Sequence, residues 1–148
     1  MDLWDHWWGL AQSNPAFTEW PRLTFGLTDS RIDAFLELAS ERLKPAAGEE
    51  FGGLGSIAMA MSRFPGKGWE FVKAAIWSRN GVYSTDGLRT MGEWEARNWT
   101  AEMRSELERA AGFHSEAHVR EFAGEILRGE WHRRQRIEFD EEPEVWET

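Results

Sequence analysis

The sequence contains no cysteine and no apolar run long enough to cross a membrane. Without cysteine the chain can form no disulfide, and it offers neither a thiolate nucleophile nor a thiolate ligand for zinc. A membrane-spanning helix needs about 20 mostly apolar residues, and a secretory signal begins with basic residues. This chain begins Met-Asp-Leu-Trp-Asp. We therefore expect a soluble, cytoplasmic protein with no membrane partner.

Basic residues are outnumbered by acidic ones, 17 to 26, which gives a formal net charge of −9 at pH 7. General binding to nucleic acid depends on a basic surface that neutralises phosphates. The most basic run, Arg133-Arg134-Gln135-Arg136, is followed within a few residues by acidic residues that oppose the same contact. The composition therefore disfavours direct nucleic-acid binding and suits a basic protein partner.

Tryptophan is abundant, with ten residues in a chain of 148. Large aromatic side chains contribute most where they are buried, either in a core or at a protein interface. A chain of this length is expected to form one domain and can bury a substantial core. We expect one helical domain over residues 1–139 and an acidic tail over residues 140–148, with the core as the more frequent place for tryptophan.

Apolar residues recur at the spacing of an α-helix face through most of the chain. Thr28-Asp29-Ser30 and Thr100 are suited to cap helices, and Pro45 ends the helix before it. The pattern predicts an all-α protein, an orthogonal bundle of about five or six helices. The expected helices cover residues 3–12, 29–43, 54–63, 69–79, 101–111 and 116–128.

Four segments lack this regularity. Residues 15–20 are expected to form a short helix followed by an extended piece, because Pro21 interrupts any longer helix. Asn80-Gly81 is expected to form a left-handed C-cap, with a hairpin turn as the alternative. Residues 82–91 show no period and are expected to form an ordered loop, and residues 93–99 a helical turn or two. Any β structure should be confined to short pieces near Val82 and residues 137–139.

The last two expected helices should form a helical hairpin. Gly112 is placed to end the first of them, Phe113 to pack back on Leu107, and Ser115 to cap the second. The apolar faces of the helices define the expected core. Its members are Ile32, Phe35, Leu36, Leu38, Ala39, Leu54, Ile57, Ala58, Met61, Val72, Ile76, Leu107, Val119, Phe122 and Ile126.

A glycine segment, Phe51-Gly52-Gly53-Leu54-Gly55-Ser56, leads into the most uniformly apolar part of the chain. Its glycines permit a sharp turn and the close approach of a neighbouring element. Gly53-x-Gly55-x-x-Ala58 also matches the relaxed dinucleotide-binding fingerprint, but that fingerprint follows a β-strand, which the preceding residues do not predict. We therefore expect a tight packing corner at the start of a buried helix, and no cofactor.

Other candidate chemistry is sparse. His114 and His118 could share a helix face and bind a metal, but no acidic zinc-protease motif accompanies them. Glu93 and Glu95 could serve acid–base catalysis, yet acidic residues are so common here that such pairs arise by chance. There is also no Gly-x-Ser-x-Gly nucleophile elbow. We expect no metal site and no catalytic residue.

The glycine segment, preceded by a capped amphipathic helix and followed by an apolar one, resembles a Gly-Gly-x-Gly-Ser segment of small acidic bacterial proteins of the toxin-immunity type. The resemblance implies an immunity or antitoxin-type inhibitor that neutralises a basic toxic effector by stoichiometric binding. Complementary charge would accelerate the encounter, and buried aromatic anchors would slow release.

Two alternatives to an immunity protein stay open. A phage- or mobile-element-encoded inhibitor of a nucleic-acid-binding defence protein has the same requirements, because an acidic surface competes for a cationic groove. A small helical enzyme of unknown reaction is the second alternative. The surroundings of the gene would separate the three: a toxin gene, a phage operon or a metabolic operon.

The contact surface should combine carboxylates with aromatic residues that the core does not use. Residues 83–99 are expected to anchor the partner through Trp94, and the acidic tail is expected to steer it by charge. The alternative is that Trp94 and Trp99 belong to the core. The candidate contact residues are Asp86, Glu93, Trp94, Glu95 and Trp99 in the first region and Asp140, Glu141, Glu142 and Trp146 in the second.

Overall fold

The computed structural model describes residues 2–45 and 51–131, and over these ranges all regular structure is helical. The all-α class is confirmed. The described residues form eight α-helices, more than the five or six expected, and the orthogonal arrangement of the bundle stays a prediction. The acidic tail and the expected β piece at residues 137–139 lie outside the described residues.

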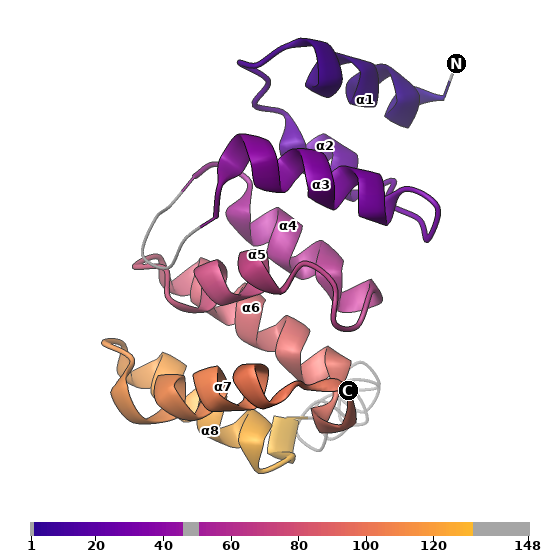
Figure 1. Ribbon diagram of the computed structural model, residues 1–148. Helices are drawn as coiled ribbons and strands as arrows, with labels where there is room; N and C mark the ends of the chain where they lie inside the picture. The colour runs from indigo at the N-terminus through magenta and orange to yellow at the C-terminus, as the bar shows by residue number, and fades with distance from the viewer. Residues whose placement is uncertain (1, 46–50, 132–148) are drawn as a thin grey trace, which may run out of the picture.

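The helices form a stack that follows the order of the chain, with α1 at one end and α7 and α8 at the other (Figure 1). Helix α6 lies within the stack and packs against α4, α5 and α8. Within the described ranges, no helix is both long and apolar enough to span a bilayer. The elements are α1 (Leu3–Ser13), α2 (Trp20–Thr24), α3 (Ile32–Leu43), α4 (Leu54–Ala60), the 3-10 helix η1 (Met61–Arg63), α5 (Trp69–Ile76), α6 (Gly81–Trp94), the 3-10 helix η2 (Ala96–Asn98), α7 (Ala101–Phe113) and α8 (Ala117–Leu127).

Helix α6 corrects the expectation of a loop over residues 82–91. Asn80 neither ends the preceding helix nor turns a hairpin: its side-chain oxygen accepts a hydrogen bond from the Val82 amide and caps the start of α6. The buried face of α6 includes Ser84, Gly87 and Thr90, which carry no apolar signal. This composition explains why hydrophobic periodicity did not predict the helix. The expected β piece near Val82 is also wrong, because Val82 lies in the first turn of α6.

Helix α2 corrects the expected helix at residues 15–20. Pro21 lies in the first turn of α2, where backbone amides do not donate within the helix. The lack of an amide hydrogen on proline therefore costs no hydrogen bond there, and Pro21 is compatible with the start of the helix. The Thr24 hydroxyl then donates to the Pro21 carbonyl within the single short turn.

The expected helix caps are confirmed at one position and displaced at others. The Thr100 hydroxyl accepts a hydrogen bond from the Met103 amide at 3.1 Å, as predicted for the start of α7. Residues 28–30 do not cap α3 with a side chain, since the helix begins at Ile32, later than the expected start at residue 29. Helix α8 is likewise preceded by Glu116 and not capped by Ser115.

Helices α7 and α8 pack against each other, which confirms the helical hairpin. Helix α7 continues through Gly112 to Phe113, so Gly112 does not end it. The side chain of Phe113 is 84% exposed and does not pack back on the helix as expected. The connection to α8 therefore leaves a large apolar side chain in contact with solvent.

The core contains the residues that the helical pattern predicted. All fifteen expected members are buried except Leu36, Leu38 and Phe122, which are half-buried against the core. The tryptophans belong to it too. Among the described residues, Trp4, Trp20, Trp94 and Trp131 are buried, and Trp7, Trp8, Trp69, Trp77 and Trp99 are half-buried against the core.

The glycine segment forms the packing corner that the sequence predicted. Gly53 has φ +96°, a conformation that favours glycine, immediately before α4. Gly55 faces α6, where an added Cβ would lie 2.7 Å from Asp86 Oδ2 and 2.8 Å from Tyr83 Cδ1. The absence of a side chain at Gly55 therefore allows α4 and α6 to approach closely.

Replacing Gly55 by valine should lower the free energy of unfolding by about 1–3 kcal/mol, because the side chains of Asp86 and Tyr83 on α6 must shift to admit the new side chain. Gly9 provides the matched control: it lies inside α1 with open space around it, so Gly9→Ala should raise the same free energy by about 0.5–1 kcal/mol. Chemical denaturation followed by circular dichroism measures both. Unchanged stability of Gly55→Val would contradict the packing role.

Candidate protein-binding surface

The structure places Trp94 in the core. Its side chain is fully buried, and its indole Nε1 donates to the Met61 carbonyl at 2.7 Å. Trp99 is half-buried, and its Nε1 donates to the Met91 carbonyl at 2.9 Å. Trp94 thus follows the alternative that assigned it to the core, and we no longer propose it as an anchor.

The carboxylates expected to act with Trp94 do not converge on one site. Asp86 is half-buried and lines a hollow with Arg89, whereas Glu95 and Trp99 line a different hollow beside α8. Glu93 is exposed near the C-terminal end of α6. Asp140, Glu141, Glu142 and Trp146 lie outside the described residues.

A different surface, at the junction of α1, α2 and α4, displays apolar side chains to solvent. Phe25, directly after α2, is 86% exposed, Leu3 of α1 is 69% exposed and Met59 of α4 is 44% exposed. Phe25 lines two hollows at once, one shared with Leu3 and the other with Met59. Exposed apolar side chains grouped in this way mark an interaction site more often than scattered ones do.

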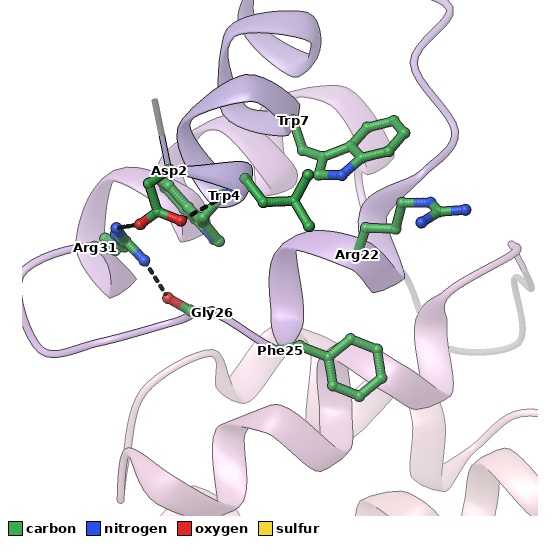
Figure 2. Close-up of a pocket in the computed structure, with 8 residues that line it drawn as sticks. Asp2, Trp4, Trp7, Arg22, Phe25, Gly26 and Arg31 are labelled. Carbon is green, nitrogen blue, oxygen red and sulfur yellow. Dashed lines mark hydrogen bonds and ion pairs between the residues drawn. The ribbon is translucent and has the colours of Figure 1, made fainter.

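The two hollows are large enough to receive side chains. The first, with a volume of about 350 Å³, is shown in Figure 2, where Phe25 projects from the end of α2. The second has a volume of about 420 Å³. We call the two hollows together the Phe25 surface. The first is lined by Asp2, Leu3, Trp4, Trp7, Arg22, Phe25, Gly26 and Arg31, and the second by Thr24, Phe25, Ser56, Met59, Ala60 and Arg63.

The backbone that carries Phe25 is held by side chains from three other parts of the chain. Trp4 Nε1 donates to the Leu23 carbonyl at 2.9 Å, and Arg31 Nη1 donates to the Gly26 carbonyl at 2.8 Å. Arg63 donates to the carbonyls of Thr24 and Leu27, at 2.9 and 3.3 Å. The carbonyls on both sides of Phe25 are therefore fixed, while its ring stays in solvent.

The Phe25 surface is locally basic although the chain is acidic. Its charged lining residues are Asp2 and three arginines, of which Arg63 alone lines the second hollow. The hydrogen bond and charge of Arg31, 2.7 Å from the Asp2 carboxylate, together with the Trp4 amide, hold the pKa of Asp2 below its ordinary value of 3.8. Asp2 is thus charged at neutral pH and already paired. Arg22 is paired as well, with the Glu19 carboxylate at 3.1 Å. The net positive charge of the surface therefore comes from Arg63, which lines the second hollow and favours an occupant that carries a carboxylate there.

The arginines also cover aromatic rings. The guanidinium of Arg22 lies 4.7 Å from the ring centre of Trp7, and that of Arg31 lies 4.4 Å from the ring centre of Trp4. Arginine and aromatic side chains are the residue types that contribute most to binding at protein interfaces. The composition of the Phe25 surface therefore favours a protein contact.

A separate hollow, outside the Phe25 surface, lies at the start of α6. It has a volume of about 520 Å³, and Asp86, Arg89 and His118 are among its lining residues. Burial raises the pKa of the Asp86 carboxyl above its ordinary value of 3.8, and the charge of Arg89 opposes this shift more weakly. Residues with shifted pKa values in a hollow are found at many active sites, although structural causes produce them as well.

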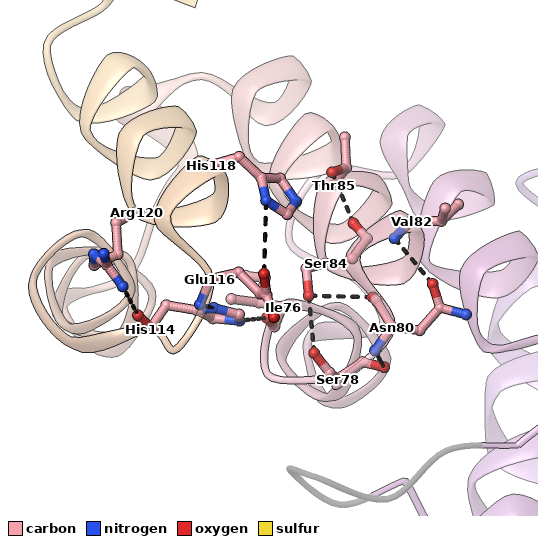
Figure 3. A network of polar contacts seen from close by, with 11 residues as sticks. Ile76, Ser78, Asn80, Val82, Ser84, Thr85, His114, Glu116, His118 and Arg120 are labelled. Atoms are coloured by element: carbon pink, nitrogen blue, oxygen red, sulfur yellow. Dashed lines mark hydrogen bonds and ion pairs between the residues drawn. The ribbon is translucent and has the colours of Figure 1, made fainter.

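The polar network beside this hollow is structural (Figure 3). His114 is buried: its Nε2 hydrogen-bonds with the Ile76 carbonyl at 2.9 Å, and its Nδ1 accepts from the Glu116 amide at 3.1 Å. Both ring nitrogens are engaged, so His114 joins α5 to the connection between α7 and α8 and has no nitrogen left for a metal. The side chain of His118, drawn in the same figure, is exposed. The described residues contain no group of three or more potential metal ligands.

Comparison with known proteins found no match: no family model, no curated protein and no solved structure is significantly similar to this chain.

Sequence reasoning missed the Phe25 surface. One signal was present in α1, whose apolar residues Leu3, Trp4, Trp7, Trp8 and Leu10 cover more than one helix face. A single face of a surface helix can be buried, so some of these side chains had to remain outside. No such signal marked Phe25, because nothing in its neighbours shows which way the ring points.

Asp86→Asn should stabilise the fold at neutral pH. The folded-state pKa of Asp86 lies above the unfolded value, so this carboxyl lowers stability progressively as the pH rises above 3.8. Asparagine carries no charge, so the gain in Tm should be absent below pH 3.8 and should grow as the pH rises through the folded-state pKa of Asp86. Thermal unfolding from pH 3 to 8 measures the difference. Glu93→Gln, at an exposed carboxylate of the same helix, should change Tm less.

Proposed function

We propose that the chain is a small protein-binding inhibitor of the immunity or antitoxin type, which neutralises a basic effector by stoichiometric binding. The observation that carries the proposal is Phe25: a large apolar ring in solvent, between two hollows, on a backbone fixed by Trp4, Arg31 and Arg63. A folded protein gains nothing from exposing such a ring. Burial of a phenylalanine side chain by a partner contributes about 1.5–3 kcal/mol.

The fixed backbone increases the affinity that Phe25 can provide. A loop that orders on binding loses conformational entropy, and each immobilised side chain costs roughly 0.5–1.5 kcal/mol. Around Phe25, the hydrogen bonds to four neighbouring carbonyls are already present in the free protein. The surface is therefore pre-organised, which favours slow dissociation of a partner.

The net charge of −9 supplies the second part of the proposal. Charge acts beyond the contact itself, and an acidic protein attracts a basic partner over about a Debye length, roughly 8 Å at physiological ionic strength. The acidic tail concentrates this charge. The Phe25 surface would thus anchor the partner while the acidic tail accelerates the encounter. The same division of roles supports the first alternative, an inhibitor of a nucleic-acid-binding defence protein.

A helical enzyme is the second candidate function, and the hollow at the start of α6 is the observation in its favour. Asp86, with its raised pKa, lies there with Arg89 and His118. General acid catalysis uses carboxyls of this kind. The Phe25 surface has no place in such an enzyme, so the two functions predict effects of different mutations.

The test begins with a pull-down from the native host, followed by binding kinetics on the purified partner. Phe25→Ala should raise Kd about 10–30-fold, mainly through faster dissociation, as expected for a residue at the centre of a contact. Deleting the acidic tail, so that the chain ends at Phe139, should slow association and flatten its salt dependence.

Phe113→Ala is the matched control, because Phe113 is 84% exposed and lines neither hollow of the Phe25 surface. This variant should bind as the unmodified chain does. A partner that binds Phe25→Ala with unchanged affinity would contradict the anchoring role. A partner that is acidic, or whose association ignores salt, would contradict the proposed class of effector.

A further inference from the structure

We propose that the acidic tail of the chain is itself a ligand of the Phe25 surface and covers it until a partner displaces the tail. The Phe25 surface, described above, is apolar, hollow and locally basic in a protein of net charge −9. These properties call for an occupant with both carboxylates and large apolar side chains. The inference does not depend on the identity of any partner and can be tested without one.

The sequence of the acidic tail provides this combination. Between residues 140 and 148 there are five acidic residues and no basic one, and Val145-Trp146 lies among them. Arg63 can pair with a carboxylate of the acidic tail, and Trp146 can enter a hollow beside Phe25. Arg22 and Arg31 already pair with Glu19 and Asp2, whereas Arg63 is the charged residue of the second hollow and donates to main-chain carbonyls, which do not neutralise its charge. Charge-assisted hydrogen bonds from arginine to carboxylate are among the stronger polar contacts.

The acidic tail is long enough to reach this surface within one molecule. Trp146 follows Trp131, the last described residue, by 15 positions, which corresponds to about 50 Å of extended chain. The path from α8 to the second hollow passes α6 and α4 to α2, elements that contact one another in that order. Packed helices lie about 8–10 Å apart, so the path is about 25–30 Å.

Occupation by the acidic tail has a consequence for the proposed function. The tail would shield the exposed ring of Phe25 in the free protein and lower the risk of non-specific association. A basic partner would attract the carboxylates of the tail away from the arginines and leave the hollows open for its own apolar side chains. Binding of the partner would then be coupled to release of the tail.

The absence of cysteine makes a direct test possible in the full-length chain. Thr148→Cys introduces a single thiol to which a nitroxide spin label can be attached. In nuclear magnetic resonance spectra of the labelled chain, the amides of Gly26 and Met59 should lose most of their intensity, and that of Phe113 should not. Reduction of the nitroxide should restore the signals.

Substitutions and salt then test the contacts. Phe25→Ala and Arg63→Gln should each reduce the broadening at Met59 severalfold, and Phe113→Ala should leave it unchanged. High salt should reduce the broadening, because the pairing of exposed charges is screened. Broadening at Phe113, or none at either hollow, would overturn the proposal.

A mixing experiment separates the tail of the same molecule from that of a second copy. Isotope-labelled chain without the nitroxide is mixed with nitroxide-labelled chain that carries no isotope. The proposal predicts no broadening at Gly26 or Met59 in this mixture. Broadening as strong as in the single labelled chain would show that the surface receives the tail of another molecule and would overturn the proposal. A failure here leaves the proposed function untouched, because partner kinetics with Phe25→Ala are measured independently.

Discussion

The contact between α4 and α6 is the interaction on which the rest of the helix stack depends, because α6 also packs against α5 and α8. Gly55 permits the close approach, and two buried hydrogen bonds then fix the register of the pair. Thr90 Oγ1 donates to the Ala58 carbonyl and Trp94 Nε1 to the Met61 carbonyl, both at 2.7 Å. Breaking either bond would leave a buried polar group unsatisfied, which costs roughly 1–3 kcal/mol. A slipped register of α4 against α6 is therefore unfavourable.

The same combination of apolar area and one directed donor explains the use of tryptophan throughout the stack. An indole fills the space between helices and still has an N–H that can bond to an adjacent element. Four indoles bond in this way: Trp4 to the Leu23 carbonyl, Trp77 to the Glu106 carboxylate, Trp94 to the Met61 carbonyl and Trp99 to the Met91 carbonyl. At these four positions tryptophan joins neighbouring elements, whereas the buried Nε1 atoms of Trp69 and Trp131 have no hydrogen-bond partner among the described residues, so those two indoles contribute by packing. The large apolar side chains that are exposed belong to Phe, Leu, Met and Val, which carry no hydrogen-bond donor.

How far the sequence predicted this structure depended on whether each element carries an apolar stripe. Helices α1, α3, α4, α5, α7 and α8 have one, and their positions were predicted to within a few residues. Helix α6 was missed because small and polar residues such as Ser84 and Gly87 form much of its buried face. Asn80-Gly81 misled for a related reason, since asparagine suits a helix start, a helix end and a turn equally. The candidate site was not predictable, because the backbone around Phe25 is held by Arg31 nearby and by Trp4 and Arg63, which are distant in sequence.

Those contacts also decide how the exposure of Phe25 should be interpreted. A ring left outside by poor packing would lie on a backbone with few long-range contacts. Here the carbonyls of Leu23, Thr24, Gly26 and Leu27 all accept hydrogen bonds from side chains of α1, η1 or the start of α3. Close packing restricts the segment further, since a Cβ at Gly26 would lie 2.5 Å from Trp4 Cδ1. The chain thus orders the backbone around a side chain that it does not bury. The same hydrogen bonds that join α1, α2 and η1 also pre-organise Phe25, so a group that covered the ring would lose little backbone entropy on binding.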